Sequence, residues 1–184
     1  MPLAMRIRGT TILAIRSEEE RKAVVAADGQ ATMKNQILKS TIRKVHKIYD
    51  NQVLVGFAGT TADSLTLFER FEGKLKDCGG NLKKAAVELT KDWRSDRVLR
   101  RLQALMAVAS RQGLLLISGS GDVLEPDDGM VGLGSGGAYA LSAARALRQE
   151  TRLPIREIAE KALKIAGAID IYTNQEITIE ELEW

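Results

Sequence analysis

Cysteine and histidine are almost absent from this sequence. Its 184 residues include one cysteine, Cys78, and one histidine, His46. One cysteine cannot close a disulfide within the chain, and together with one histidine it cannot build a structural zinc site. A lone thiol is typical of proteins from a reducing compartment, so we expect a cytoplasmic protein.

Long apolar runs are also missing. The longest one near the start, Ile12 to Ile15, is too short for the apolar core of a secretory signal. No stretch approaches the roughly 20 apolar residues that a membrane-spanning helix needs. We therefore expect no membrane partner.

The scarcity of histidine limits the available catalytic chemistry. A Ser-His-Asp or Cys-His site would have to use His46, which lies in a basic run with Arg43, Lys44 and Lys47. The neighbouring positive charges oppose protonation of the ring and make it a poor general base. We interpret His46 as part of a charged strand face, and we expect any catalytic base to be another group.

The charge balance is too even to indicate a nucleic-acid partner. Lysine and arginine number 27 and aspartate and glutamate 24, which leaves a net charge of +3. The basic run from Lys91 to Arg101 also contains Asp92 and Asp96. Mixed signs at helical spacing are typical of a solvated or subunit-contact face, so no nucleic-acid binding is expected.

The hydrophobic pattern alternates between blocks of strands and pairs of helices. Apolar stripes at helical spacing predict two helices within 65–93, separated by Gly79-Gly80, and two more within 140–169. Regular β-α alternation is absent, which argues against a doubly wound parallel sheet. The pattern predicts one α+β domain with antiparallel sheets covered by helices. Its strands are expected at 11–15, 23–27, 41–49, 52–58, 104–109, 114–118, 130–133 and 175–182.

A glycine-rich segment, Gly132 to Gly137, follows an apolar strand and opens a helix. Its spacing satisfies G-x-G-x-x-G, a dinucleotide fingerprint, but no βαβ unit surrounds it. We favour a close-approach loop that brings backbone N–H groups and Ser135 to another site, and a simple tight turn is the alternative. The chain also lacks a G-x-x-x-x-G-K-[ST] segment, so we expect no bound nucleotide.

Gly9-Thr10-Thr11 offers a nucleophile that needs no histidine. An α-amino group has an unperturbed pKa of about 7.7–8.0 and is a suitable general base. A threonine at a processed N-terminus carries both a hydroxyl nucleophile and that amine. From the residue types alone this is one hypothesis among several.

Seven segments share an order and spacing that extend over nearly the whole chain, from about Gly9 to Leu182. They are Gly9-Thr10-Thr11-Ile12, ADGQAT at 27–32, VGFAG at 55–59, AAVELTKDWR at 85–94, GSGG at 134–137, IAEKA at 158–162 and IYTN at 171–174. Together they resemble the HslV family, the peptidase subunits of a bacterial two-component ATP-dependent protease related to proteasome β-subunits. The resemblance implies the four-layer αββα sandwich of N-terminal nucleophile hydrolases. It also implies a leader, residues 1–9, removed by processing, and a single peptidase domain at 10–184.

The resemblance assigns a role to five residues by position. Thr10 is the implied nucleophile, and Asp28 and Lys44 match its acidic and basic partners. An ammonium on Lys44 would disfavour the protonated form of the free amine, and Asp28 would hold Lys44 charged and oriented. Gly59 matches the backbone N–H that stabilises the oxyanion, and Ser135 matches the hydroxyl that orients the terminal amine.

The resemblance further implies a monovalent cation, expected to be Na⁺, held by backbone carbonyls. The matching positions are Gly167, Asp170 and Thr173. The family often has cysteine where this chain has Asp170, and a carbonyl ligand survives that change. Thr60 is another departure, because glycine is common there, next to the implied oxyanion position.

The function implied by the resemblance is an N-terminal threonine endopeptidase in two stacked six-membered rings. Its substrates would be unfolded proteins delivered by a partner ring ATPase of the AAA+ class, since this chain has no nucleotide-binding motif of its own. A catalytically silent ring subunit is the alternative. Retention of Thr10, Asp28, Lys44 and Ser135 argues against that alternative.

Overall fold

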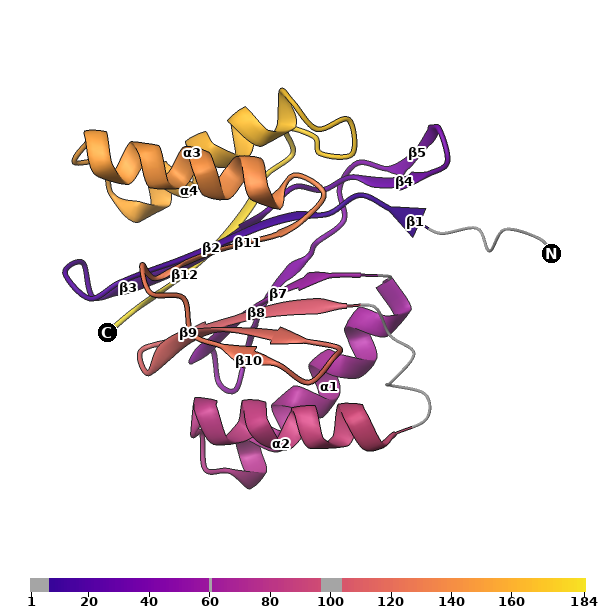
Figure 1. The fold of residues 1–184 in the computed structure, drawn as a ribbon, viewed down its shortest axis with the longest axis vertical. Coiled ribbons are helices and arrows are strands. Elements are labelled where there is room, and N and C mark those ends of the chain that lie inside the picture. Colours follow the sequence, from indigo (N-terminus) through magenta and orange to yellow (C-terminus); the bar gives the residue numbers. More distant parts are fainter. Residues whose placement is uncertain (1–6, 60, 97–103) are drawn as a thin grey trace.

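Two antiparallel β-sheets lie face to face at the centre of the protein (Figure 1). The computed structural model describes residues 7–59, 61–96 and 104–184. The first sheet has the strand order β11-β2-β3-β12, with β2 at Thr11–Ser17, β3 at Lys22–Ala27, β11 at Met130–Gly134 and β12 at Thr178–Glu183. The second has the order β10-β9-β8-β7-β6, with β6 at Val45–Ile48, β7 at Val53–Ala58, β8 at Leu105–Ser110, β9 at Gly113–Ser118 and β10 at Val123–Leu124.

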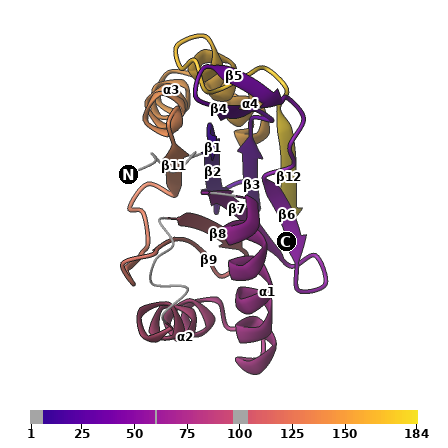
Figure 2. The same ribbon diagram turned by 90° about the vertical axis from the view of Figure 1, so that its right-hand side faces the viewer.

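A pair of helices covers the outer face of each sheet (Figures 1 and 2). Helices α1 (Thr61–Asp77) and α2 (Leu82–Ser95) share a hydrophobic core with strands β7, β8 and β9. Helices α3 (Gly137–Glu150) and α4 (Ile155–Gly167) pack on β2 and β3 of the other sheet. The resulting order of layers is αββα, which confirms the predicted fold class.

Alternating side chains bury both faces of the four-stranded sheet. In β2, Ile12 and Ala14 belong to the core between the two sheets, whereas Leu13 and Ile15 pack against α3 and α4. The two sheets approach closely at Gly56 of β7, where an added Cβ would lie 2.8 Å from a methyl group of Ile12. A strand buried on both faces therefore appears in the sequence as a continuous apolar run.

Helix α2 begins at a capping side chain and packs through one apolar stripe. The side chain of Asn81 accepts a hydrogen bond of 2.9 Å from the backbone N–H of Lys84, which satisfies one of the free donors at the helix start. The predicted apolar stripe is fully buried, and its members are Leu82, Ala85, Ala86, Leu89 and Trp93.

The structure also contains short strands that the sequence pattern did not predict. Strands β1 (Ile7–Arg8), β4 (Ala31–Met33) and β5 (Gln36–Lys39) form a small sheet in the order β1-β4-β5. All of β5 is exposed, so it lacks the alternating buried positions that mark a strand. The strand β10 was missed for a similar reason, and the strand expected at 41–49 covers only Val45–Ile48.

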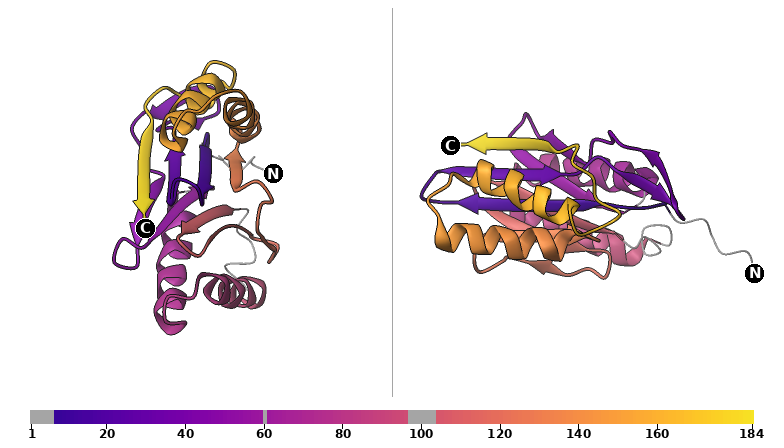
Figure 3. Two further views of the ribbon diagram at one scale, coloured as in Figure 1. Left: turned by 90° about the vertical axis from the view of Figure 1, so that its left-hand side faces the viewer. Right: turned by 90° about the horizontal axis from the view of Figure 1, so that it is seen from above.

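The β4–β5 hairpin and the C-terminus lie at opposite ends of the molecule (Figure 3). Thr60 and residues 97–103, which include the end of the basic run, lie outside the described residues. Among the helices that the structure describes, none is both long enough and apolar enough to cross a membrane.

Candidate active site

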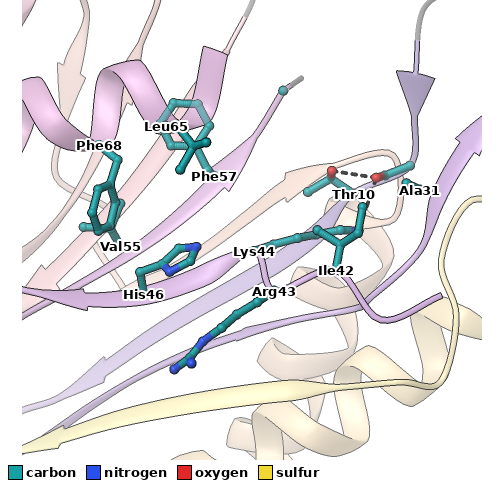
Figure 4. Close-up of a pocket in the computed structure, with 12 residues that line it drawn as sticks. Thr10, Ala31, Ile42, Arg43, Lys44, His46, Val55, Phe57, Leu65 and Phe68 are labelled. Carbon is teal, nitrogen blue, oxygen red and sulfur yellow. Dashed lines mark hydrogen bonds between the residues drawn. The ribbon is translucent and has the colours of Figure 1, made fainter. Parts of the chain in front are cut away.

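Thr10 directly precedes β2 and lies next to a buried pair formed by Asp28 and Lys44. The Nζ atom of Lys44 donates a hydrogen bond of 2.7 Å to Oδ1 of Asp28 and one of 3.2 Å to the carbonyl oxygen of Gly9. The hydroxyl of Thr10 donates to the same carbonyl oxygen at 2.6 Å. The fold therefore brings Lys44 to the Gly9–Thr10 peptide bond (Figure 4), with Asp28 bonded to Lys44.

Lys44 is the inward-facing member of its basic run. It is 8% exposed, and Asp28 is fully buried. Desolvation lowers the pKa of the Lys44 ammonium below its ordinary value, while the ion pair with Asp28 and the charge of Asp170 oppose that shift. Arg43 is different, because its side chain is mostly exposed and pairs with Glu180.

Backbone N–H groups fix the orientation of the Asp28 carboxylate. Its Oδ1 accepts from the N–H of Thr11 at 2.8 Å, in addition to Lys44. Its Oδ2 accepts from the N–H of Gln30 at 2.8 Å and from that of Asn174 at 3.4 Å. Because these donors belong to three different segments, the carboxylate holds Lys44 in one position relative to Thr10.

The glycine-rich segment passes Thr10 more closely than a side chain would allow. A Cβ on Gly134 would lie 1.8 Å from the carbonyl oxygen of Thr10, and the residue has a φ of +83°. The backbone N–H of Ser135 donates to that oxygen at 3.0 Å. A Cβ on Gly136 would lie 2.3 Å from the hydroxyl oxygen of Thr11. The predicted close-approach loop is confirmed.

Asp170 joins this glycine-rich loop to the loop after α4. Its Oδ2 accepts from the hydroxyl of Ser135 at 2.7 Å and from that of Thr173 at 2.5 Å. Because Thr173 gives its only hydroxyl proton to Asp170, the Thr11 hydroxyl donates to Thr173 at 2.6 Å. Thr11 in turn accepts from the N–H of Gly136 at 3.0 Å. A continuous chain of hydrogen bonds thus links β2 to Ser135.

Sequence reasoning missed most of this network. It named Asp170 only as part of a cation site, and it gave no role to the side chains of Thr11 or Asn174. The one available signal is the Asp-x-x-Thr spacing of Asp170 and Thr173, because short polar side chains often bond to nearby groups in their own loop. The hydroxyl of Thr11, which is fully buried, gave no signal distinct from that of any strand threonine.

The loop at 167–173 offers oxygen atoms that fit a monovalent cation. Within the described residues, the carbonyl oxygens of Gly167 and Thr173 accept no hydrogen bond, and that of Asp170 accepts one of 3.0 Å, from the N–H of Thr173. Oxygen ligands suit hard cations. The carboxylate of Asp170 already accepts hydrogen bonds from Ser135, Thr173 and the N–H of Tyr172, whereas its carbonyl accepts one.

A cavity of about 190 Å³ opens beside Thr10 (Figure 4). Gly59, which sequence reasoning assigned to the oxyanion, lines the same cavity as Thr10 and Lys44. Ser135 contacts Thr10 through its backbone N–H. The five predicted catalytic positions therefore gather at one end of the sandwich. The cavity walls are formed by Gly9, Thr10, Ala31, Ile42, Arg43, Lys44, His46, Val55, Phe57, Gly59, Leu65 and Phe68.

Several known proteins resemble this chain over nearly its whole length. A family model described as proteasome subunit matches residues 7–182. The chain is 56% identical over 176 residues to the ATP-dependent protease subunit HslV of Syntrophobacter fumaroxidans, which covers 96% of this chain and 97% of that protein. It is 56% identical over 178 residues to HslV of Pseudothermotoga lettingae, with coverage of 97% and 100%. The crystal structure of eukaryotic HslV from Trypanosoma brucei has a TM-score of 0.89 at 42% identity, over 95% of this chain and 99% of that chain. The chain therefore belongs to the proteasome subunit family and, within it, to the HslV protease subunits.

Proposed function

We propose that this chain is an N-terminal threonine endopeptidase that exposes Thr10 by cutting its own Gly9–Thr10 bond. The observation that carries the proposal is the position of Lys44. Its Nζ atom lies 2.7 Å from Asp28 and 3.2 Å from the carbonyl oxygen of Gly9, in a nearly dry environment. A positive charge so placed can stabilise negative charge that develops at the carbonyl when the peptide bond is attacked.

Processing begins with the hydroxyl of Thr10 beside the Gly9 carbonyl. Attack of Oγ1 on the carbonyl carbon gives a tetrahedral intermediate whose oxyanion lies beside Lys44. Collapse of this intermediate breaks the C–N bond, and the nitrogen of Thr10 takes the hydroxyl proton. The resulting ester between Gly9 and Thr10 is then hydrolysed by water, which releases residues 1–9 and leaves Thr10 with a free amine and a free hydroxyl.

The free amine then acts as the general base for peptide hydrolysis. It accepts the proton of Oγ1 while this oxygen attacks the substrate carbonyl. The charge on Lys44 disfavours protonation of the amine, so a larger fraction of the amine accepts a proton near neutral pH. Gly59 supplies the N–H for the oxyanion, and Ser135, held by Asp170, orients the amine.

A bound Na⁺ would supply a structural link and no chemistry at the reacting atoms. The carbonyl groups of Gly167, Asp170 and Thr173 are the proposed ligands. Their loop also carries the Asp170 side chain that holds Ser135. We therefore propose that the cation keeps Ser135 at a fixed position relative to Thr10.

The proposed assembly is two stacked six-membered rings whose active sites face an enclosed chamber. Unfolded protein substrates would be delivered by a partner ring ATPase of the AAA+ class. The names of the curated relatives, ATP-dependent protease subunits, support this division of labour. The single cysteine of the chain suits the reducing cytoplasm, where we place the assembly.

Mass spectrometry of the purified protein tests the proposal. We expect the chain to begin at Thr10, and we expect Thr10→Ala to keep its leader and to hydrolyse no fluorogenic peptide. Thr11→Ser is the matched control, because it keeps the buried hydroxyl and should both mature and hydrolyse peptides. Peptide hydrolysis by Thr10→Ala at the normal rate would show that Thr10 is not the nucleophile.

The same samples separate the peptidase from a silent ring subunit. Light scattering at micromolar concentration should give a mass near twelve chains whether the chain is a peptidase or a silent ring subunit. A silent subunit would keep an intact leader in that assembly, whereas the peptidase would begin at Thr10. A persistent monomer would count against both.

A further inference from the structure

The cavity beside Thr10 contains one imidazole ring, that of His46, to which the proposed mechanism gives no role. His46 lies on β6 opposite Val55 of β7, and its ring meets that of Phe68 edge-on, with centroids 5.2 Å apart and planes at 71°. Figure 4 shows the ring between Lys44 and the apolar side chains of Val55 and Phe68. The interpretation of His46 as part of a charged strand face is therefore wrong, because the ring forms part of the cavity wall.

The rest of the cavity wall suits an uncharged guest. The charge of Lys44 is compensated by Asp28, and the guanidinium of Arg43 points away from the cavity to pair with Glu180 (Figure 4). The volume of about 190 Å³ exceeds the ~150 Å³ of an apolar protein cavity that holds benzene, so a leucine or phenylalanine side chain fits. The remaining wall is apolar and is formed by Ala31, Ile42, Val55, Phe57, Leu65 and Phe68.

The position of Thr10 identifies which substrate side chain enters. Thr10 and Gly59 both line the cavity, and these are the proposed nucleophile and the proposed oxyanion donor. The reacting carbonyl must therefore lie at the cavity entrance. The side chain that reaches the cavity belongs to the residue that carries this carbonyl, which we call the P1 residue.

The charged groups around His46 come from its own segment and from β12. Burial and the charge of Arg43 lower the pKa of His46 below 6.5, and these outweigh a backbone hydrogen bond at Arg43 and the charge of Glu180 on β12, which raise it. Lys44 and Lys47 flank the ring in sequence and pair with Asp28 and Glu180. Among the described side chains, β7 and α1 present uncharged groups to it, Val55 and Phe68. The ring is therefore neutral at pH 8, and it takes up a proton at a lower pH than an exposed imidazole does.

We propose that His46 determines P1 specificity: the cavity favours apolar side chains while the ring is neutral and acidic side chains once the ring is charged. The inference rests on the proposed function, since it takes Thr10 as the nucleophile. An apolar P1 side chain that packs against the neutral ring removes no charge from water. The same side chain packed against an imidazolium removes a charge from water, which costs free energy. A glutamate side chain has the opposite preference, because it forms an ion pair only with the charged ring.

The test is a ratio of two substrates on the assembled, mature enzyme. Two fluorogenic peptides that differ only in leucine or glutamate at P1 are hydrolysed between pH 8 and pH 5, and kcat/KM is measured for each. Protonation of the Thr10 amine slows both peptides equally and cancels in the ratio. The glutamate, with a pKa of about 4.3, stays largely ionised throughout. We expect the leucine-to-glutamate ratio to fall about tenfold from pH 8 to pH 5.

Three variants assign the effect to His46. His46→Gln should give a ratio that is independent of pH, since glutamine does not titrate. His46→Arg, with a permanent charge, should give a low ratio already at pH 8. Lys47→Gln changes the next residue of the same strand, outside the cavity, and should behave like the unmodified enzyme.

A wild-type ratio that does not change with pH, or an equal change in His46→Gln, would overturn the inference. Failure of the proposed function has a different signature, namely peptide hydrolysis that is absent in the wild type or survives Thr10→Ala. Thr10-dependent hydrolysis with a selectivity indifferent to His46 therefore counts against this inference alone.

Discussion

The Nζ atom of Lys44 lies 3.2 Å from the carbonyl oxygen of Gly9, the residue that precedes the proposed nucleophile. In the sequence, Lys44 is one of several cationic residues in a short run and could equally belong to a solvated face. In the structure it is 8% exposed and bonded to the buried Asp28, whereas Lys47 pairs with Glu180 near the surface. Lys44 thus differs from Lys47 in its burial and in its ion-pair partner.

Replacement of Lys44 should abolish most peptide hydrolysis. In chains whose leader has been removed independently, Lys44→Ala is expected to reduce kcat by about 10²–10⁴-fold, because it removes the charge that keeps the Thr10 amine unprotonated. Lys44→Arg should not restore activity, since a planar guanidinium cannot occupy the site of a compact ammonium.

Lys47→Ala is the matched control for Lys44. As a surface substitution it should change the free energy of unfolding by no more than about 0.5 kcal/mol and leave turnover nearly unchanged. Light scattering is used to check that each variant assembles. If Lys44→Ala assembles normally and keeps more than a tenth of the activity, Lys44 has no catalytic role.

Gly9→Ala should slow processing without changing the mature enzyme. Gly9 has a φ of +112°, and an added Cβ would lie 3.0 Å from the carbonyl oxygen of Tyr172. The strain, about 1–3 kcal/mol, would be relieved by moving the Gly9 carbonyl away from Lys44. A displacement of about 1 Å can cost 10²-fold in rate. Mass spectra collected over time after synthesis measure the loss of the leader.

Two comparisons make the Gly9 experiment decisive. Once the leader is gone, the Gly9→Ala protein is chemically identical to the wild type, so its kcat should be the same. Gly73→Ala places a methyl group in open space on α1. It should leave processing unchanged and stabilise the helix by about 0.5–1 kcal/mol. Processing of Gly9→Ala at the wild-type rate would contradict the proposed geometry.

The layered fold could be predicted because its strands and helices are marked by periodicity. Residues 12–15 and 23–27 are apolar on both faces, and both strands lie between a sheet and a helical layer. The stripe that ends in Trp93 is equally clear, since every member is buried. Strand β5 carries no such signal, because none of its side chains is buried and its position depends on pairing with β4.

The polar part of the site could be predicted only in part, for a physical reason. Asp28 and Lys44 were found through the resemblance, and the fold brings them within 2.7 Å. The bond between Ser135 and Asp170 joins residues 35 positions apart and depends on how the loop after α4 folds back toward β2. No local pattern encodes such a contact. His46 was misjudged because its neighbours in sequence are charged, whereas its ring packs edge-on against Phe68.

Asp170→Asn should distinguish the role of the Asp170 side-chain carboxylate from that of the Asp170 backbone carbonyl. The amide oxygen can still accept from the hydroxyl groups of Ser135 and Thr173, but without the negative charge that strengthens both bonds. The amide NH₂ group then faces the backbone N–H of Tyr172, which loses its acceptor. We expect kcat to fall by about tenfold or more. The dependence of activity and of thermal stability on Na⁺ should persist, because the proposed ligands are backbone carbonyl groups.

The dependence of activity and thermal stability on Na⁺ is measured by exchanging Na⁺ for choline, in the wild type and in Asp170→Asn. The thermal midpoint of the wild type and of Asp170→Asn should drop by a similar amount when Na⁺ is removed. Loss of the Na⁺ effect in Asp170→Asn alone would mean that the carboxylate itself binds the cation. Wild-type turnover in that variant would mean that the negative charge of Asp170 has no part in catalysis.

His46→Gln should make the folded protein less sensitive to mild acid. In the folded protein the pKa of His46 is below the 6.5 expected for an exposed ring, because of burial and the charge of Arg43. Between these two pKa values the unfolded chain binds more protons than the folded chain, so the free energy of unfolding falls as the pH falls. Glutamine does not titrate and removes this contribution, while every other group stays the same. The test is the thermal midpoint of the wild type, His46→Gln and Lys47→Gln at pH 7.5 and at pH 5. All three proteins are measured at one protein concentration, because assembly affects the midpoint. The drop in midpoint from pH 7.5 to pH 5 should be smaller for His46→Gln than for the other two proteins. Equal drops in all three proteins would mean that the ring has the same proton affinity folded and unfolded, which its position against Phe68 argues against.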